Sequence, residues 1–296
     1  MPELPEVETM RRGIAALSGA RIVEARFPAG ACRALAITPR PDRLASLLRG
    51  VRLGVVERHG KRVAIGIEST ADAGPAWLVI EPRMTGLLLV ADPPTGKHLR
   101  MELLLEPPAP HPVLRFWDQR GLGTIRLLDA AGFERACGPR ALGPDGLTVT
   151  AEALAGRLGG SRRAVKVALL DQRVVAGIGN IYAAEILHRA GIDPRRECRR
   201  LGDDDLERIA AATRRVLARA VELEGSSIGD ELYRTADNRK GRFQKLHRVY
   251  GREGEACRGC GGPIERIVQA QRSTFFCATC QPHRPGRRLV RRRRTA

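Results

Sequence analysis

Four cysteines near the C-terminus constrain the fold of this chain more than any other feature of its sequence. Cys257 and Cys260 form one C-x-x-C pair, Cys277 and Cys280 form a second, and sixteen residues separate the two pairs. This spacing is typical of zinc ribbons, in which two such pairs place four thiolates tetrahedrally around one Zn²⁺ ion. The alternative is a set of four buried thiols without a metal. Because four cysteines leave no ligand position open, we expect one structural zinc ion that takes no part in chemistry.

The net charge indicates the kind of partner that such a zinc module serves. The chain has 51 Lys and Arg residues against 33 Asp and Glu residues, a formal net charge of +18 at pH 7. Seven arginines lie between Arg284 and Arg294, but the rest of the chain still carries +11 without them. A basic body indicates a polyanionic partner. Together with the zinc module, the charge predicts a protein that binds nucleic acid.

The chain has no signal for a membrane or for export. It has no run of about 18 apolar residues, which a membrane-spanning helix would need. Its first residues, MPELPEVETM, contain three glutamates and no apolar segment, unlike a signal peptide. We therefore expect a cytoplasmic protein, associated with the nucleoid if its partner is DNA.

The distribution of apolar residues predicts an α+β protein. One face of an N-terminal helix carries Val7, Met10, Ile14 and Leu17. Short β-rich runs follow from Arg21 to about Leu128, with one helical insert, and predict an antiparallel sandwich or barrel. A Gly- and Pro-rich stretch and several helical patterns come next. We divide the chain into a β-sandwich domain (1–130), a linker (131–147), a helical domain (148–245), the zinc module (246–283) and a disordered basic tail (284–296).

A glycine-rich turn precedes one of the predicted helices. Gly177, Gly179 and Asn180 stand in the segment VAGIGNIYAAEIL, directly before its helical part. Unpaired backbone amides and the helix dipole favour an anion at such a position. Asn180 could bind a phosphate there, or it could only cap the helix. Lys166 lies upstream and could face the same surface.

The second residue of the chain is a candidate nucleophile. Methionine is normally removed before a small residue, so Pro2 would become a secondary amine at the N-terminus. An α-amino group titrates near 7.7–8, which leaves a useful unprotonated fraction at neutral pH. Such an amine can attack an electrophilic carbon and form an iminium, and Glu3 or Glu6 could act as a general acid beside it. The alternative is an ordinary acidic first turn of a helix.

Four sequence blocks together resemble bacterial formamidopyrimidine-DNA glycosylases. They are the start MPELPEVET, the Gly-Lys of HGKRV, the segment LLDQRVVAGIGNIYAAEILHRAGIDP and the ending VYGREGEACRGCGGPIERIVQAQRSTFFCATC. The blocks occur in the family's order over nearly the whole chain. The resemblance implies an N-terminal β-sandwich with flanking helices, a helix–two-turn–helix domain and a C-terminal zinc finger.

The resemblance also implies an activity and assigns roles to particular residues. The family bends duplex DNA, extrudes a damaged purine and excises it, and then cuts the strand by β- and δ-elimination. By this resemblance Pro2 attacks C1′ of the sugar, Glu3 protonates its ring oxygen, and Glu6 helps to order the site. The resemblance also implies contacts with DNA. Lys61 matches a lysine that contacts the phosphate beside the lesion, and Arg272 matches an arginine that contacts the DNA backbone. Lys166 and Asn180 match residues near the extruded nucleotide. The lesion-capping loop corresponds to about 226–244.

Two departures from the family pattern affect the expected DNA contacts. The family fills the gap left by the extruded base with three side chains, of which Met84 and Arg120 match the first two. Leu122 stands where the family has phenylalanine, and Gly121 replaces a second arginine. Leucine is still an apolar wedge but lacks aromatic stacking. Gly229 also replaces an arginine in the capping loop, so the lesion spectrum and the preferred opposite base stay open.

Three functions are consistent with the sequence. The first is a base-excision repair enzyme, a bifunctional glycosylase and lyase that acts as a monomer on oxidised purines in double-stranded DNA. The second is an activity on oxidised pyrimidines, as in the sister family endonuclease VIII, whose members normally have glycine in place of Leu4. The third is a zinc protein that binds damaged DNA without catalysis.

Overall fold

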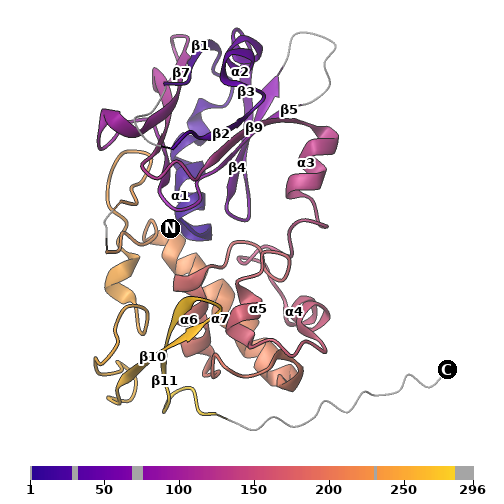
Figure 1. Cartoon of the computed structure of the whole chain (residues 1–296), viewed down its shortest axis with the longest axis vertical. Helices are drawn as coiled ribbons and strands as arrows, with labels where there is room; N and C mark the ends of the chain where they lie inside the picture. Colours follow the sequence, from indigo (N-terminus) through magenta and orange to yellow (C-terminus); the bar gives the residue numbers. More distant parts are fainter. Residues whose placement is uncertain (1, 29–32, 69–75, 230–231, 284–296) are drawn as a thin grey trace, which may run out of the picture. The chain divides into compact units, whose positions relative to one another are not determined.

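The computed structural model describes residues 2–28, 33–68, 76–229 and 232–283 (Figure 1). The chain forms two compact units, of which the first contains residues 1–141 and 220–245 and the second contains residues 142–219 and 246–296. Within the described residues, no helix is long and apolar enough to cross a membrane. The basic tail predicted for 284–296 lies outside the described residues.

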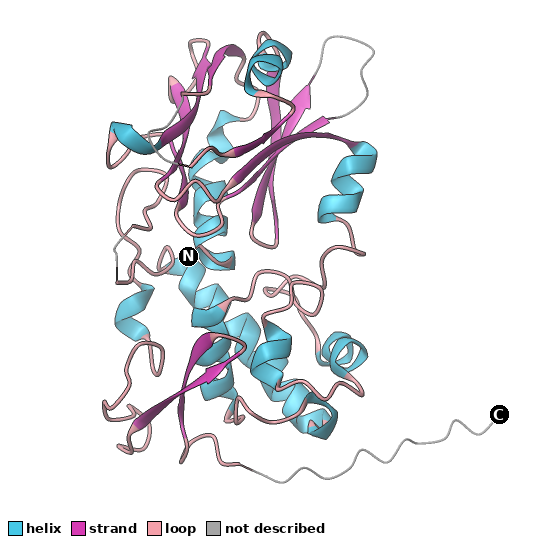
Figure 2. Cartoon of the chain, in the orientation of Figure 1, coloured by secondary structure: helices cyan, strands magenta, loops and turns pink. Residues whose placement is uncertain are grey.

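Two β-sheets form the body of the first unit (Figure 2). The four-stranded sheet is antiparallel and has the order β1 (Ile22–Arg26), β7 (Leu99–Leu105), β8 (Val113–Asp118), β6 (Gly86–Leu89). The five-stranded sheet has the order β2 (Ala36–Thr38), β9 (Thr124–Asp129), β5 (Ala76–Glu81), β4 (Arg62–Glu68), β3 (Arg52–His59). Its pairs are antiparallel except for β2 with β9. The predicted antiparallel pattern is therefore wrong at β2, a three-residue edge strand.

One apolar core joins the two sheets. On β4, Val63, Ile65 and Ile67 belong to this core, as the two-residue period of a strand requires. Buried residues of the four-stranded sheet, such as Leu103 and Phe116, belong to the same cluster. Helix α1 (Leu4–Ile14) adds its apolar face to the core and contacts β3, β4 and β6. The structure confirms the predicted α+β class and its β-sandwich.

A helix covers the outer face of the five-stranded sheet where the sequence predicts a linker. Helix α3 (Ala130–Cys137) begins after Asp129, whose Oδ1 accepts a hydrogen bond from the Gly132 amide at 2.7 Å. Its Phe133 ring stacks on Trp77 of β5, with the ring centroids 4.5 Å apart. The sequence does not reveal this helix because alanine and glycine interrupt its apolar pattern.

The second unit is mostly helical and ends in a hairpin. Its elements are α4 (Ala151–Leu158), α5 (Val165–Leu169), α6 (Asn180–Ala190), η3 (Cys198–Arg200), most of α7 (Asp203–Glu222), β10 (Ile264–Gln269) and β11 (Arg272–Cys277). Three aspartates begin α7, where negative charge stabilises the helix dipole. Helix α6 ends at Gly191, whose φ of 67° is the left-handed conformation that favours glycine.

Residues 220–245 pack with the first unit, although the sequence-based division places 148–245 in one helical domain. Val90 donates its amide to the carbonyl of Ala236 at 3.0 Å. On α1, a Cβ added to Gly13 would lie 2.4 Å from the Cβ of Ala236, so this contact requires glycine. The polar sequence of this segment carries no periodic apolar pattern from which such long-range contacts could be predicted. The remaining short elements are α2 (Pro41–Leu48) and three 3₁₀ turns, η1 (Ala15–Leu17), η2 (Gly96–His98) and η4 (Phe243–Leu246).

Candidate active site and zinc centre

A small pocket in the first unit has Pro2 in its wall. The other lining residues come from β6 and the turn before it and from the segment after α7, and they are Met84, Thr85, Leu87, Ser226, Ile228, Leu232 and Tyr233. Pro2 itself is buried, as are Glu3 and Glu6, each of which is 1% exposed. Burial raises the pKa of the Tyr233 hydroxyl well above its ordinary value. The two ends of the first unit's sequence therefore build one pocket around the candidate nucleophile.

The Glu6 carboxylate joins the start of α1 to the segment after α7. One oxygen, Oε2, accepts the backbone amide of Glu3 at 2.9 Å, and the other, Oε1, accepts the backbone amide of Ser226 at 2.8 Å. Gly225 lies against this carboxylate with φ +78°, and a Cβ there would be only 2.7 Å from Oε1. Because both amides are buried, Glu6 supplies acceptors that water cannot replace. Its position makes it a residue that orders the pocket.

Replacing Glu6 with alanine should destabilise the protein and disorder this pocket. Two buried amides would lose their acceptor, at a cost of about 1–3 kcal/mol each in the free energy of unfolding. Glu6→Gln keeps one carbonyl oxygen and should lose roughly half as much. Urea denaturation measures both, with Glu68→Ala, at an exposed glutamate, as the control. An unchanged midpoint for Glu6→Ala would refute the role of this carboxylate.

A buried hydrogen-bond network connects the turn that carries Met84 to the turn that carries Arg120 and Leu122. Asp118 is fully buried, and its Oδ1 accepts the Thr85 hydroxyl at 2.5 Å and the Arg120 amide at 3.2 Å. Its Oδ2 accepts the amide of Gly123 at 2.8 Å. Met84 and Leu122 are half-buried and Arg120 is exposed. The two turns therefore form one connected unit.

Gly121 fixes the shape of the second turn. Its φ is +59°, and a Cβ would lie 2.4 Å from the carbonyl oxygen of Arg33. A side chain is excluded both by conformation and by space. The arginine that the family pattern has at this position could be accommodated here only if the backbone around Arg33 moved.

In the second unit, Lys166 and Asn180 meet the hairpin of the zinc module. Lys166 Nζ donates to Asn180 Oδ1 at 2.6 Å, and Asn180 Nδ2 donates to the carbonyl of Ser273 at 3.0 Å. Lys166 is fully buried, Asn180 is half-buried, and Arg272, beside Ser273, is exposed. These contacts anchor the strand that carries Arg272 to helices α5 and α6. Lys61 belongs to the first unit, where it is half-buried in the turn between β3 and β4.

An ion-pair cluster stabilises the turn between α5 and α6 and should give a pH-dependent stability. Hydrogen bonds from Arg173, together with Arg163, lower the pKa of Asp171 to about 2. An unfolded aspartate titrates near 3.9. The stabilisation is therefore complete above about pH 5 and is lost progressively as the pH falls towards 2 and below. Thermal unfolding between pH 2 and 6 should show this loss for the wild type, and an acid limb that is flatter by this one contribution for Asp171→Asn.

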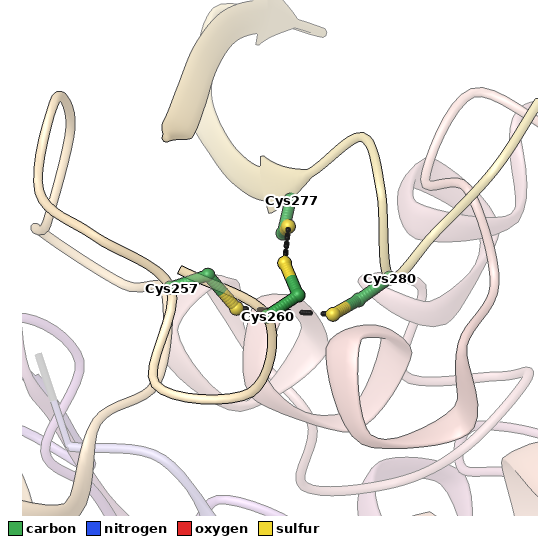
Figure 3. A group of neighbouring side chains, drawn as sticks. All are labelled: Cys257, Cys260, Cys277 and Cys280. Carbon is green, nitrogen blue, oxygen red and sulfur yellow. Dashed lines mark hydrogen bonds between the residues drawn. The ribbon is translucent and has the colours of Figure 1, made fainter. Parts of the chain in front are cut away.

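The four cysteines of the predicted zinc site converge in the second unit (Figure 3). Their sulfur atoms all lie within 4.8 Å of one another. The Cys257 and Cys280 sulfurs are 3.8 Å apart, and those of Cys260 and Cys277 are 3.4 Å apart. Tetrahedral zinc with bonds of about 2.3 Å would place its ligands about 3.8 Å apart. The residues therefore fit one structural Zn²⁺ ion.

His188 connects the zinc site to helix α6. Its Nε2 lies 3.5 Å from the sulfur of Cys257, and the histidine is buried. A metal-bound thiolate can only accept a hydrogen bond, so the Nε2 nitrogen must carry the proton. Burial raises the pKa of Cys257, but hydrogen bonds from the Gly259 amide and from His188 lower it to about 6. Such a thiol is readily deprotonated, as metal binding requires.

The structure brings the sequence-predicted residues together in three groups. Pro2, Glu3, Glu6 and Met84 lie at the pocket of the first unit, Lys166 and Asn180 lie beside the strand of Arg272, and the four cysteines form the zinc site. The sequence alone does not reveal Thr85, Asp118, Ser226, Tyr233 or His188. Their partners are distant along the chain, and no local spacing marks them.

The fold and its sites define a protein with a β-sandwich, a helical unit and a four-cysteine zinc finger. Family models match the chain in three segments: the formamidopyrimidine-DNA glycosylase N-terminal domain (1–125), the helix–two-turn–helix domain of the same enzymes (142–231) and the zinc finger found in these enzymes and in isoleucyl-tRNA synthetase (254–282). The chain is 41% identical to formamidopyrimidine-DNA glycosylase of Thermomicrobium roseum, over 95% of this chain and 99% of that one.

Solved structures give the same result. The MutM (Fpg) protein of Thermus thermophilus has a TM-score of 0.81 and 37% identity, over 96% of this chain and all of that one. A Lactococcus lactis Fpg mutant in complex with DNA containing Fapy-dG has a TM-score of 0.81 and 29% identity, over 95% of this chain and all of that one. The chain belongs to the formamidopyrimidine-DNA glycosylase family. The predicted family, fold and zinc finger are confirmed.

Proposed function

We propose that the protein is a base-excision repair enzyme that removes oxidised purines, such as 8-oxoguanine and formamidopyrimidines, from double-stranded DNA. The observation that carries this proposal is the Pro2 pocket in a chain that matches DNA glycosylases over nearly its full length. The enzyme has both glycosylase and lyase activity. Within this proposal it acts as a monomer in the cytoplasm, associated with the nucleoid.

The proposed reaction uses the Pro2 amine after removal of Met1. The nitrogen attacks C1′ of the damaged nucleotide, and the bond from C1′ to the base breaks as the base leaves with a proton. Glu3, buried beside Pro2, protonates the sugar ring oxygen, so that the ring opens to an iminium. Elimination then expels first the 3′-phosphate and next the 5′-phosphate. Glu6 positions the amine by holding the start of α1.

The other candidate residues bind the DNA in this proposal. Lys61 contacts the phosphate next to the lesion, and Arg272 contacts the backbone through its guanidinium. Asn180 binds a phosphate near the extruded nucleotide, where the amides at the start of α6 add to the attraction. Lys166 is fully buried and acts there by orienting Asn180 through its hydrogen bond to the Asn180 side chain. Met84, Arg120 and Leu122 fill the gap that the extruded base leaves. The network around Asp118 supports this insertion because it connects the two turns that carry these side chains.

Replacing Leu122 with phenylalanine should strengthen binding to a duplex that contains an abasic site. An aromatic ring can stack on the neighbouring base, a contact worth about 1–3 kcal/mol, so we expect a decrease in Kd of roughly tenfold or more. Fluorescence anisotropy with a non-cleavable abasic analogue measures the effect. Leu246→Phe, at an exposed leucine of η4, is the control and should leave Kd unchanged. An unchanged Kd for Leu122→Phe would show that this residue does not enter the base stack.

Borohydride trapping tests the proposed function directly. Protein with verified removal of Met1 is incubated with duplexes that contain 8-oxoguanine, formamidopyrimidine, an abasic site or an oxidised pyrimidine, each opposite all four bases. A covalent adduct and strand cleavage with the purine lesions are expected. Preference for the pyrimidine lesions would favour the activity of endonuclease VIII. Selective binding without an adduct would show a damage-binding protein that lacks catalysis.

A further inference from the structure

The second unit contains an open pocket whose lining includes none of the residues assigned to the DNA contacts. Arginines from three elements line it: Arg189 at the end of α6, Arg208 and Arg215 on α7, and Arg248 after η4. Gly259 and Cys280 of the zinc module complete this wall. We call these four arginines and their cavity the arginine pocket.

Three of the four arginines in the arginine pocket carry positive charge that no carboxylate of the described residues balances. Arg208 is held in place, since it donates to the carbonyl of Ala190 at 2.8 Å and to Asp205 at 2.5 Å. Arg189, Arg215 and Arg248 are exposed, and within the described part of the chain no carboxylate forms an ion pair with any of them. Desolvation lowers the pKa of Arg189, and repulsion by Arg215 and Arg248 lowers it further. A bound anion would remove this repulsion.

The chemistry of the lining favours a phosphate group over an acidic peptide. The guanidinium groups of Arg189, Arg215 and Arg248 line one pocket, and each can present a planar pair of donors to phosphate oxygens. The neutral part of the lining includes Ala190, Ala211, Ala212 and Gly259. These small residues offer no anchor for a large apolar side chain, which a bound peptide would normally use.

The pocket is separate from the phosphate contacts proposed at the other end of α6. Arg189 follows Asn180 by nine residues on this helix, which corresponds to roughly 14 Å along its axis. We propose that the arginine pocket is a second phosphate site, which binds the backbone of a DNA segment outside the one held by Asn180 and Arg272. This inference rests on the proposed function only in so far as the protein binds DNA.

The test compares two triple variants. The pocket variant is Arg189→Ala/Arg215→Ala/Arg248→Ala. The control variant, Arg43→Ala/Arg135→Ala/Arg157→Ala, loses the same charge at exposed arginines of three other helices. Affinity is measured against salt concentration for an undamaged 40-bp duplex and for a 13-bp duplex with 8-oxoguanine. For the 40-bp duplex, the pocket variant should bind at least tenfold more weakly, with a salt slope smaller by about 0.9 for each lost phosphate contact. The affinity of the control variant should decrease much less.

Further measurements distinguish the possible causes of weaker DNA binding by the pocket variant. Borohydride trapping on the 13-bp duplex reports the proposed activity independently, so failure of trapping in the wild type would refute that function and not the pocket. An Arg189→Lys/Arg215→Lys/Arg248→Lys variant with wild-type zinc content should recover part of the affinity. An equal loss of DNA affinity in the control variant would overturn the proposed DNA site. Binding of only inorganic phosphate or polyglutamate by the pocket would also overturn it.

Discussion

Replacing Pro2 with leucine should abolish covalent trapping on DNA that contains 8-oxoguanine. Methionine is not removed before a large residue, so Met1 would remain and the α-amine would move one residue away from the pocket. Loss of a covalent nucleophile typically lowers kcat by orders of magnitude, and we expect a decrease of roughly 10⁴-fold or more. Single-turnover cleavage measures the rate, and mass spectrometry establishes the N-terminus.

Pro2→Gly is the matched control for this experiment. Methionine is removed before glycine, so a primary amine would stand where the proline nitrogen stood. This variant should still form an adduct, although more slowly, because its amine has a different pKa and less restricted geometry. Normal trapping by Pro2→Leu with Met1 retained would place the nucleophile elsewhere in the chain.

Replacing Cys277 with serine should abolish DNA binding first, and activity only as a consequence. Structural zinc sites contribute apparent binding free energies of about 10–16 kcal/mol, so the hairpin β10–β11 should not keep its structure without the ion. Arg272 begins β11 and would lose its fixed position, as would the contact of Ser273 with Asn180. We expect a Kd for damaged duplex that is at least 100-fold higher, together with loss of bound zinc in metal analysis.

Cys198→Ser is the control, because Cys198 is a buried cysteine of the same unit outside the zinc cluster. It should keep one zinc ion per chain and bind DNA normally. If Cys277→Ser bound damaged duplex like the wild type and yet failed to cut it, the zinc module would have a part in the chemistry that we do not assign to it.

The features that could be predicted from the sequence are those that neighbouring residues determine. The spacing of Cys257 and Cys260 already specifies a zinc knuckle, and the periodicity of Val7, Met10 and Ile14 specifies the buried face of α1. The alternation on β4 likewise predicts which side chains enter the core. The family resemblance adds the order of the domains, which the comparisons confirm. The individual roles of Pro2, Glu3 and Lys61 stay predictions.

Long-range contacts account for what could not be predicted. The bond between Glu6 and Ser226 joins residues 220 positions apart, and the bond between Thr85 and Asp118 joins residues 33 positions apart. Neither pair leaves a local pattern, because a serine or threonine in a turn is compatible with many partners. Helix α3 cannot be predicted for two reasons: alanine and glycine interrupt its apolar pattern, and its stability depends on Phe133 packing against Trp77, which lies on a distant strand.

The first unit is built from two stretches of sequence that part of the second unit separates, and this has a consequence for synthesis of the protein. Residues 142–219 of the second unit stand between the β-sandwich and the segment that carries Ser226 and Tyr233. A ribosome therefore completes the strands of the sandwich long before it releases the residues that close the Pro2 pocket. Chains truncated before Gly225 lack the partner of Glu6, and they also lack Tyr233 and Ala236, which belong to the core of the sandwich. The nascent protein thus acquires its reactive pocket only when most of the chain has been made.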